Sequence, residues 1–584
     1  MAKDYTNDAV LEKQLKTRLD ELIARYDDRN DLLDECEKMY NLDWDADQPG
    51  DPAFAKTMTT SPDPFNKCNN AIRLLTAANP NIHVPYESNS PDARKQSDKL
   101  EKYLNTTVSV IDRVRGKPLV VDAATSGAVL NGIYGCVVPT KTLVESTRKL
   151  DDANPRNNAL KRRYEKIAKQ TSYMVELYDP RTCYPEFDQY GLVAIARQVD
   201  NMKGADVVAR WGDLAYSLAG IKPDDLETEV EYSEYWDDVI HATWAGGKIL
   251  NIEEHGYPCL PWAAVIVEGT TSLFTEAKYQ EHPFLYALNK SNLWIDQNIA
   301  LTAMYSSVLR MGALPQMLYK KKPMSEGTIN PDYSQLGGVI TIETDEDFGA
   351  LTKRPVDPAL VQSLDLANQM VTASTMYDQT VGAPIGASAT FSATALLSQQ
   401  GRIVLVALQR AMSQFFGKVS EIMLELTREG YGNKVQSKES VISIDRKDVP
   451  EEIFVDAMVD VKMPQDERQN ALVALQTVGN KLVSKRFARE NYLQIGQSAD
   501  MEKEILDEDV MAVILQLAAQ QQIAQAQQQA QGQMQGVSPE QGQMMQQGGG
   551  TAAGMPAMQP GGPMPTPGET GQIPFEQQGL ENPA

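Results

Sequence analysis

Apolar side chains recur every three or four residues near the start of the chain, which is the spacing of one face of an α-helix. Charged residues fill the positions between them, so residues 6–40 are predicted to form one helix or two. The same pattern predicts helices over 65–78 and over 93–114. Residues 1–117 are therefore expected to form a helical region. The apolar positions of the first stretch are Leu11, Leu15, Leu19, Leu22 and Ile23.

Strand-like alternation of apolar and polar positions begins after a small-residue helix predicted over 122–132. Gly246 and Gly247 follow the last of these strands, and glycine supplies the positive φ angles that tight hairpin turns need. Residues 118–281 are thus predicted to be a mixed α/β region with a hairpin at 245–248. Its expected strands are 133–139, 173–178, 192–199, 229–236 and 239–244.

Helical periodicity returns over 284–311, within a region that spans 282–311. Residues 312–357 contain several Gly and Pro residues, and short strands are expected there at 316–320 and 339–342. Pro358 then opens a helix predicted over 358–380, because proline at the first helical turn leaves no hydrogen bond unmade.

The longest apolar seam follows a break made almost wholly of small residues, at 381–391. It predicts one helix from Ser392 to Arg428 within the region 392–430, capped by Ser392, ended by Gly430 and roughly 55 Å long. Strands at 441–444 and 454–463 are expected in the region 431–464, and helices in 465–530. Gln, Gly, Met and Pro dominate 531–584, which is predicted to be disordered. The expected fold class is α+β, mainly helical.

The charge of the chain narrows the choice of partners. The formal net charge is -24 and the sequence pI is about 4.7, which argues against a protein that grips nucleic acid mainly through Lys and Arg. Simple solubility is the plainest explanation of such an acidic balance. Five scattered cysteines without a CxxC pair suit a reducing compartment. No secretory signal and no membrane-spanning apolar run is recognised, so synthesis in a cytoplasm is expected.

Sequence motifs for catalysis are missing. No phosphate-binding loop of the GxxxxGK[ST] type occurs, and the four histidines form neither HExxH nor a spaced pair. No GxSxG is present either, and paired acids such as Asp237 and Asp238 are most simply solvated surface. We therefore expect no enzymatic activity, no catalytic residues, no metal and no cofactor.

The order of elements is more informative than any single motif. A mixed region leads into a helix, a strand-bearing insert, a returning helix, a small-residue loop, a long helix and then strands and helices again. Two passages are quoted for the resemblance that follows: SATALLSQQGRIVLVALQRAMSQFF from Ser392 and FVDAMVDVKMPQDERQNALVALQTVG from Phe454. In this order, over residues 11–509, the chain resembles the portal, or head-to-tail connector, family of phages, most closely the large portals of short-tailed phages.

The resemblance implies a portal-type subunit with wing, stem, clip and crown regions. Residues 1–117 and 118–281 would form the wing, 282–311 and 358–380 the two stem helices, and 312–357 the clip. Residues 431–464 would add wing strands, and 465–530 crown helices with a short barrel whose length the Gly and Pro content limits. The clip would dock other proteins through Lys320, Lys321 and Lys322. The channel loop at 381–391 would face DNA through Val381, Gly382, Ala383, Pro384, Ile385, Gly386, Ala387 and Ser388.

The partners implied by the resemblance are those of a capsid vertex. They are identical subunits in a ring, typically twelve, the terminase large subunit, tail adaptor, capsid and scaffolding proteins, and double-stranded DNA that passes through the channel without sequence specificity. The expected location is the virion, after assembly in the host cytoplasm, with no membrane contact. An acidic channel would repel phosphate and so let the duplex slide.

Three other classes of protein were weighed against the portal. A packaging ATPase-nuclease would need a phosphate-binding loop after a strand, and the sequence has none. Another virion structural protein, of the capsid or tail-tube type, would usually be richer in strands. A cellular coiled-coil scaffold would need a sustained heptad array. The second of these is kept as the alternative.

Overall fold

The computed structural model describes most of the first 459 residues. The described ranges are 5–43, 59–85, 90–148, 155–271, 279–312, 317–320, 347–350, 358–374, 403–436, 441–459 and 474–476, with residues 478, 485 and 488, but without 7, 212–214, 217–219 and 223–224. Two compact units divide the chain, Met1–Asp500 and Met501–Ala584, and every described residue belongs to the first. The predicted disordered tail at 531–584, and most of the predicted crown at 465–530, lie outside the described residues.

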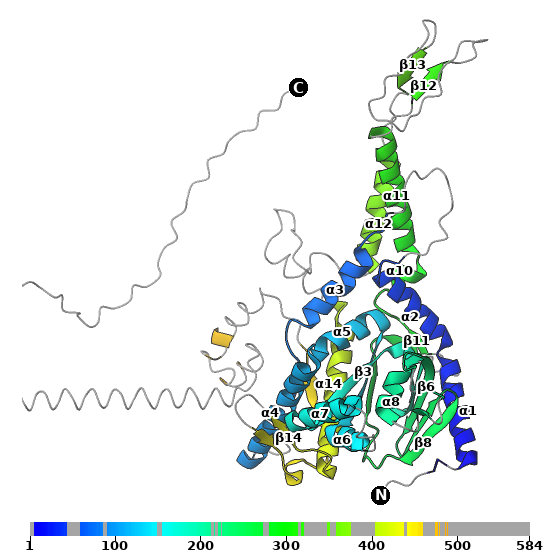
Figure 1. Ribbon diagram of the computed structural model, residues 1–584. Helices are drawn as coiled ribbons and strands as arrows, with labels where there is room; N and C mark the ends of the chain where they lie inside the picture. Colours follow the sequence, from blue (N-terminus) through cyan, green and yellow to red (C-terminus); the bar gives the residue numbers. More distant parts are fainter. Residues whose placement is uncertain are drawn as a thin grey trace, which may run out of the picture. The chain divides into compact units, whose positions relative to one another are not determined.

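The chain begins with two consecutive helices, α1 (Ala9–Arg25) and α2 (Asp27–Tyr40), so the N-terminal stretch forms two helices rather than one. Asp8 caps the first helix, because its carboxylate accepts hydrogen bonds from the backbone N–H groups of Val10 and Leu11, both at 3.1 Å. The buried face of α1 packs against the central strands of a five-stranded sheet (Figure 1). That face consists of Leu15, Leu19 and Leu22.

The five-stranded sheet is antiparallel throughout and has the order β4-β5-β6-β7-β8. Gly246 and Gly247 connect β7 to β8 with φ angles of 57° and 73°, which confirms the predicted hairpin. The strands are β4 (Cys183–Phe187), β5 (Leu192–Lys203), β6 (Glu229–Asp237), β7 (Ile240–Ala245) and β8 (Lys248–Glu254).

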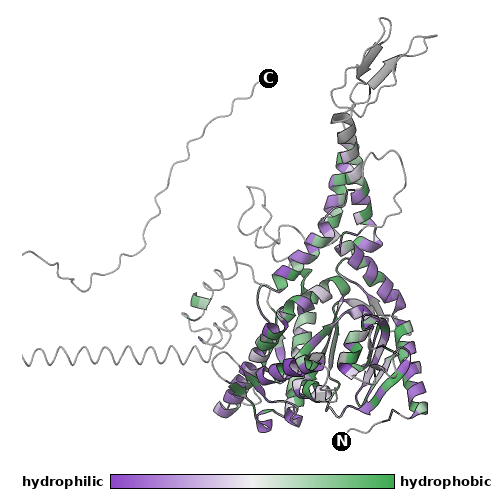
Figure 2. Cartoon of the chain, in the orientation of Figure 1, coloured by the Kyte–Doolittle hydropathy of each residue, from purple (hydrophilic) through white to green (hydrophobic). Residues whose placement is uncertain are grey.

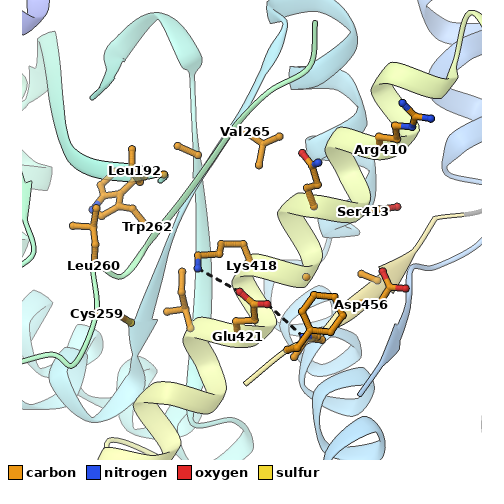
Figure 3. Close-up of a pocket in the computed structure, with 18 of the residues that line it drawn as sticks. Leu192, Cys259, Leu260, Trp262, Val265, Arg410, Ser413, Lys418, Glu421 and Asp456 are labelled. Atoms are coloured by element: carbon orange, nitrogen blue, oxygen red, sulfur yellow. Dashed lines mark hydrogen bonds and ion pairs between the residues drawn. The ribbon is translucent and has the colours of Figure 1, made fainter. Parts of the chain in front are cut away.

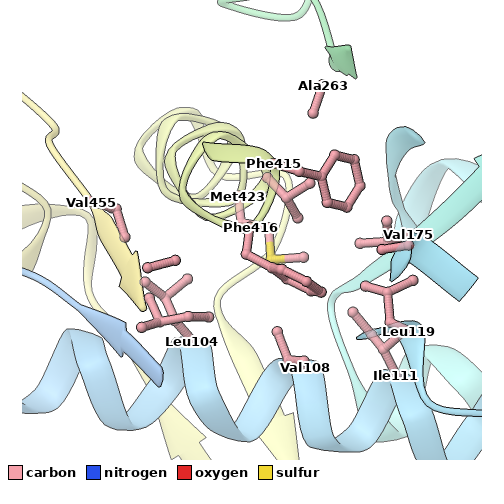
Figure 4. Packing of buried hydrophobic residues seen from close by; sticks show 14 of the residues in the cluster. Leu104, Val108, Ile111, Leu119, Val175, Ala263, Phe415, Phe416, Met423 and Val455 are labelled. Atoms are coloured by element: carbon pink, nitrogen blue, oxygen red, sulfur yellow. The ribbon is translucent and has the colours of Figure 1, made fainter. Parts of the chain in front are cut away.

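A second, three-stranded antiparallel sheet has the order β3-β2-β9. The main hydrophobic core joins this sheet to three helices, and Phe415 and Phe416 of α14 are fully buried within it (Figure 4). The elements concerned are β2 (Gly132–Pro139), β3 (Tyr173–Tyr178), β9 (Trp262–Ile266), α4 (Pro91–Arg115), α5 (Leu119–Leu130) and α14 (Val406–Glu429). Helix α14 lies between sheet and helices, so it closes the core.

The remaining described elements are shorter. Four two-stranded antiparallel pairs are β1-β16, β10-β11, β12-β13 and β14-β15. Their strands are β1 (Asn81–His83), β10 (Gly269–Thr271), β11 (Tyr279–Glu281), β12 (Met317–Lys320), β13 (Asp347–Ala350), β14 (Lys434–Gln436), β15 (Val441–Ser443) and β16 (Asp456–Met458). The remaining helices are α3 (Asp63–Leu75), α6 (Thr140–Arg148), α7 (Pro155–Gln170), α8 (Gly204–Trp211), α10 (Tyr286–Lys290), α11 (Leu293–Gly312) and α12 (Pro358–Ser374), with 3-10 turns η1 (Pro180–Thr182) and η3 (Arg446–Asp448).

Two predicted helices are shorter in the structure. The helix predicted over 284–311 is broken into α10 and α11, because Asn292 takes a left-handed conformation with φ of 53°. The helix predicted from Ser392 is interrupted by a turn at Val404 and Leu405, and α14 begins only at Val406. Leu405 is fully buried against Ala71 of α3, so tertiary packing overrides the apolar periodicity there. The 24 residues of α14 span about 36 Å.

The described fold is therefore α+β, with helices and antiparallel sheets sharing one main core. Gly430 ends α14 with a φ of 86°, as the sequence predicts. Helices α6 and α7 were not predicted. Figure 2 shows that polar residues dominate much of the helical surface, including α7.

Candidate functional site: the helix pair and the groove along α14

Helices α11 and α12 pack side by side and run antiparallel (Figure 1). Trp294, at the start of α11, shares a buried cluster with Val371, near the end of α12. One turn further on, the side-chain amide of Gln297 donates to Oδ1 of Asn368 at 2.8 Å. The chain between the two helices holds the β12-β13 strand pair, so the helices leave and re-enter the fold at the same place.

An unusual set of buried polar side chains fixes the start of α11 to residues 59–63. Asn298 accepts a hydrogen bond from the backbone N–H of Ser61 at 2.7 Å, and Thr302 accepts one from that of Thr59 at 2.9 Å. The indole N–H of Trp294 donates to the Ser61 carbonyl oxygen at 3.1 Å. Asn298 and Thr302 are almost completely buried. Because breaking such bonds would leave buried polar groups unpaired, the orientation of α11 on the rest of the fold is well determined.

Farther from this base, the helix pair exposes large apolar side chains. Tyr305 of α11 is 48% exposed, and Leu366 and Met370 of α12 are 57% and 47% exposed. Ile299 and Val361 are partly exposed as well. Leu366 and Met370 are four residues apart and so share one face of α12. An apolar face of this kind on a soluble protein usually marks a surface that another protein covers.

Of the predicted docking residues, only Lys320 is described. It ends β12, and its backbone pairs with that of Asp347 in β13. Lys321 and Lys322 lie outside the described residues, and so do the strand predicted at 339–342 and the whole predicted channel loop, Val381 to Phe391. The structure therefore brings none of the predicted site residues together.

A groove of about 1280 Å³ runs along one side of α14 and was not predicted. Its walls come from α14, from β9 and the loop before it, and from β16 (Figure 3). Tyr190 and Phe454 line it and are 87% and 65% exposed. The only hint in the sequence was Phe454 itself, a large apolar residue at the start of a predicted strand. The groove forms because β16 pairs with β1, which is remote in sequence.

The polar side chains of this groove pair mainly with one another. Lys418 forms an ion pair with Glu421 at 3.3 Å, and Glu421 also accepts from the backbone N–H of Val455 at 3.4 Å (Figure 3). Burial raises the pKa of the Cys259 thiol, and the nearby Glu425 raises it further. A thiol held in its neutral form is a poor nucleophile, so Cys259 is not activated for covalent chemistry.

Searches for other kinds of site give little. Within the described ranges, no group of three or more His, Cys, Asp or Glu residues is arranged to hold a metal ion. No helix in that part of the chain combines the length and apolar character needed to cross a bilayer. A scan against models of protein families finds no match, and a search of curated proteins finds no significant relative.

Proposed function

We propose that the chain is a portal subunit of a viral capsid vertex, which assembles into a ring, forms the channel for packaging and ejecting DNA, and provides the platform for terminase and tail adaptor proteins. The observation that carries the proposal is the α11–α12 helix pair. It leaves a mixed α/β core, encloses a strand pair and returns beside its own start, which matches the order of stem, clip and stem.

Exposed apolar residues at two separate places support assembly into a ring. One set lies on α11 and α12, and the other, with Tyr190 and Phe454, lines the groove along α14. A closed ring needs two different, complementary faces on each subunit, whereas a two-fold dimer needs only one. The cyclic arrangement of subunits, about twelve by the resemblance, would cover both sets.

The acidic composition fits a channel for DNA. With a net charge of -24, the walls of a ring would repel phosphate, and the duplex would not be trapped during passage. The small side chains at 381–388 carry no charge, so they would line the channel without binding the backbone. Lys320 to Lys322, in the predicted clip, would supply positive charge where other proteins dock.

Native mass spectrometry and negative-stain microscopy of the purified full-length chain would test this function. A closed ring with a central hole is the expected result. A shell-like or tubular assembly would support the alternative, a capsid or tail-tube protein. Monomers and dimers alone, at micromolar concentration, would overturn the proposal.

A further inference from the structure

Helix α7 has a charge opposite to that of the protein as a whole. Its 16 residues, PRNNALKRRYEKIAKQ, contain six basic residues and one acidic residue, a net of +5, whereas the whole chain carries -24. The basic residues are Arg156, Lys161, Arg162, Arg163, Lys166 and Lys169. Such a reversal, confined to one helix, needs an explanation beyond solubility.

Four of these cations are free to meet an external partner. Arg162, Arg163, Lys166 and Lys169 are all exposed, and none forms an ion pair with another residue in the described part of the chain. Arg162, Lys166 and Lys169 are spaced four and three residues apart, so they lie along one face of the helix. Glu165 is the one acidic residue of α7.

A fifth cation is held beside the helix. Strand β14 packs against α7, and Lys434 at its start is exposed. The backbone of Lys434 is fixed by Ser172, whose hydroxyl accepts from the Lys434 N–H at 2.9 Å and donates to the Lys434 carbonyl oxygen at 2.8 Å. Ser172 follows the end of α7 by two residues, so the structure fixes the position of Lys434 relative to the basic helix.

The spacing of the charges suits a phosphate backbone. From Arg162 to Lys169 the helix axis rises by about 10.5 Å, and each strand of duplex DNA carries one phosphate per about 3.4 Å of its axis. One face of α7 can therefore meet about three phosphates of a single strand. Charges on the rest of the protein weigh less, because at physiological salt the screening length is only about 8 Å.

Other anionic partners fit less well. No large apolar side chain of α7 is exposed, whereas helices that lie on membranes bury an apolar face, and protein interfaces usually have an apolar centre. Single-stranded nucleic acid is bound largely by stacking on exposed aromatic rings, and Tyr164, the one aromatic residue of α7, is half-buried.

We propose that α7, together with Lys434, is an external surface that binds the phosphate backbone of double-stranded DNA without sequence preference. This surface does not depend on the proposed function, since it requires no ring and no channel. It gives the protein a second, weaker kind of DNA contact, in which the duplex is held rather than passed through. Binding through a few such contacts falls steeply with salt.

Covalently closed circular duplex DNA is the decisive probe, because it has no end that could thread into a ring. Full-length protein is titrated with this DNA at several salt concentrations from about 50 to 200 mM. The test variant replaces Arg162, Arg163, Lys166 and Lys169 by Gln. A control variant removes the same charge elsewhere, by replacing the exposed Lys13, Lys95, Arg113 and Lys248 by Gln.

The wild-type protein and the control variant are expected to bind circular DNA with affinities within about two-fold of each other, and the test variant at least roughly ten-fold more weakly. The slope of log affinity against log salt should become shallower by about four in the test variant. The proposal is overturned if the wild type does not bind the circle, or if test and control variants bind alike. It is also overturned if polyglutamate or anionic lipid vesicles compete as well as DNA does.

Ring assembly of the same samples, measured by native mass spectrometry, separates this proposal from the proposed function. A ring that ignores circular DNA contradicts only the α7 surface. A monomer that binds it through α7 contradicts only the portal function.

Discussion

Gly417 in α14 lies directly against the backbone of Val455: a Cβ at position 417 would stand 3.0 Å from the Val455 carbonyl oxygen. This close approach lets α14 pack beside the chain that leads into β16, and both contribute to the groove. A backbone oxygen cannot turn aside as a flexible side chain can. The small size of residue 417, rather than its backbone freedom, is therefore what the fold needs here.

Replacing Gly417 with Ala should lower the free energy of unfolding by about 1–3 kcal/mol, the usual cost of overpacking. This loss is expected even though Ala favours a helix over Gly by about 1 kcal/mol. Urea denaturation would measure it. Gln414→Ala, at an exposed position of the same helix, serves as the control and should change stability by less than about 0.5 kcal/mol. Equal stability of the two variants would contradict the packing argument.

Both ring nitrogens of His255 are engaged in the neutral form. The backbone N–H of Tyr257 donates to Nδ1 at 3.1 Å, and Nε2 lies 3.0 Å from the Asp237 carbonyl oxygen, to which it donates. A proton on Nδ1 would face the Tyr257 N–H instead of accepting from it. Burial lowers the pKa of His255 below the ordinary 6.5, with His241 nearby adding to the effect, while Asp237 opposes it.

Because the folded-state pKa is lowered, the stabilising contribution of His255 is present above pH 6.5 and is lost as pH falls through the folded-state value. The melting temperature of wild-type protein should therefore fall on mild acidification below that pH. His255→Gln, which can still donate and accept, should reduce this dependence. His83→Gln, on β1, should leave the His255 contribution in place. An unchanged pH profile in His255→Gln would show that other groups govern the acid limb.

Glu281 is expected to show the opposite sign. Its carboxyl group is buried, Oε2 accepts from the Asn131 amide at 3.3 Å, and Oε1 has no hydrogen-bond partner. Burial raises the pKa of Glu281, although Arg29 and Asn131 partly offset this effect. A raised folded-state pKa means that the contribution to stability is present below pH 4.5 and is lost as pH rises.

Glu281→Gln should accordingly raise the free energy of unfolding at neutral pH, because no charge then has to be buried. The gain should shrink as pH is lowered toward 4.5, where the wild-type carboxyl is increasingly protonated in both states. Chemical denaturation at several pH values would measure it, with the exposed Glu12→Gln as control. A destabilised Glu281→Gln protein at neutral pH would mean that the carboxylate is held by stronger contacts than these.

Local patterns predict the parts of the fold that local chemistry determines. Strand β3 occupies the predicted residues, and Gly246 and Gly247 turn the hairpin, because alternation and positive φ are properties of short stretches. The break at Leu405 could not be found in this way, since it depends on burial against α3. Helix α7 was missed because its sequence is dominated by charges and has few apolar positions, while its contacts with α6 and β14 come from distant segments.

The candidate site was less accessible to sequence reasoning. The groove along α14 requires residues from β9, α14 and β16 to meet, and no periodicity indicates which elements become neighbours. The base of α11 is also a tertiary feature, because Asn298 and Thr302 are polar residues buried by their bonds to residues 59–61. The predicted channel loop stays a prediction, as its residues lie outside the described ranges.

The exposed apolar face of α12 gives the most direct test of assembly. Leu366 and Met370 are about half exposed, whereas Leu364 and Val371 point into the fold and are buried. Replacing Leu366 and Met370 together by Lys should leave the isolated subunit as stable as before, because surface substitutions change stability by only about 0.5 kcal/mol. In a ring whose neighbouring subunits cover this face, the same change buries two unpaired charges and should abolish the assembly.

The matched control is Asp365→Lys, which changes the charge by the same two units at an exposed position next to this face. Native mass spectrometry should show rings for the wild type and for Asp365→Lys but subunits for the double variant, while circular dichroism shows all three folded. Rings of normal size from the Leu366→Lys, Met370→Lys protein would mean that this face stays in solvent. The apolar side chains of the groove along α14 would then have to provide the contact, and the corresponding change of Phe454 to Lys would become the test of the ring.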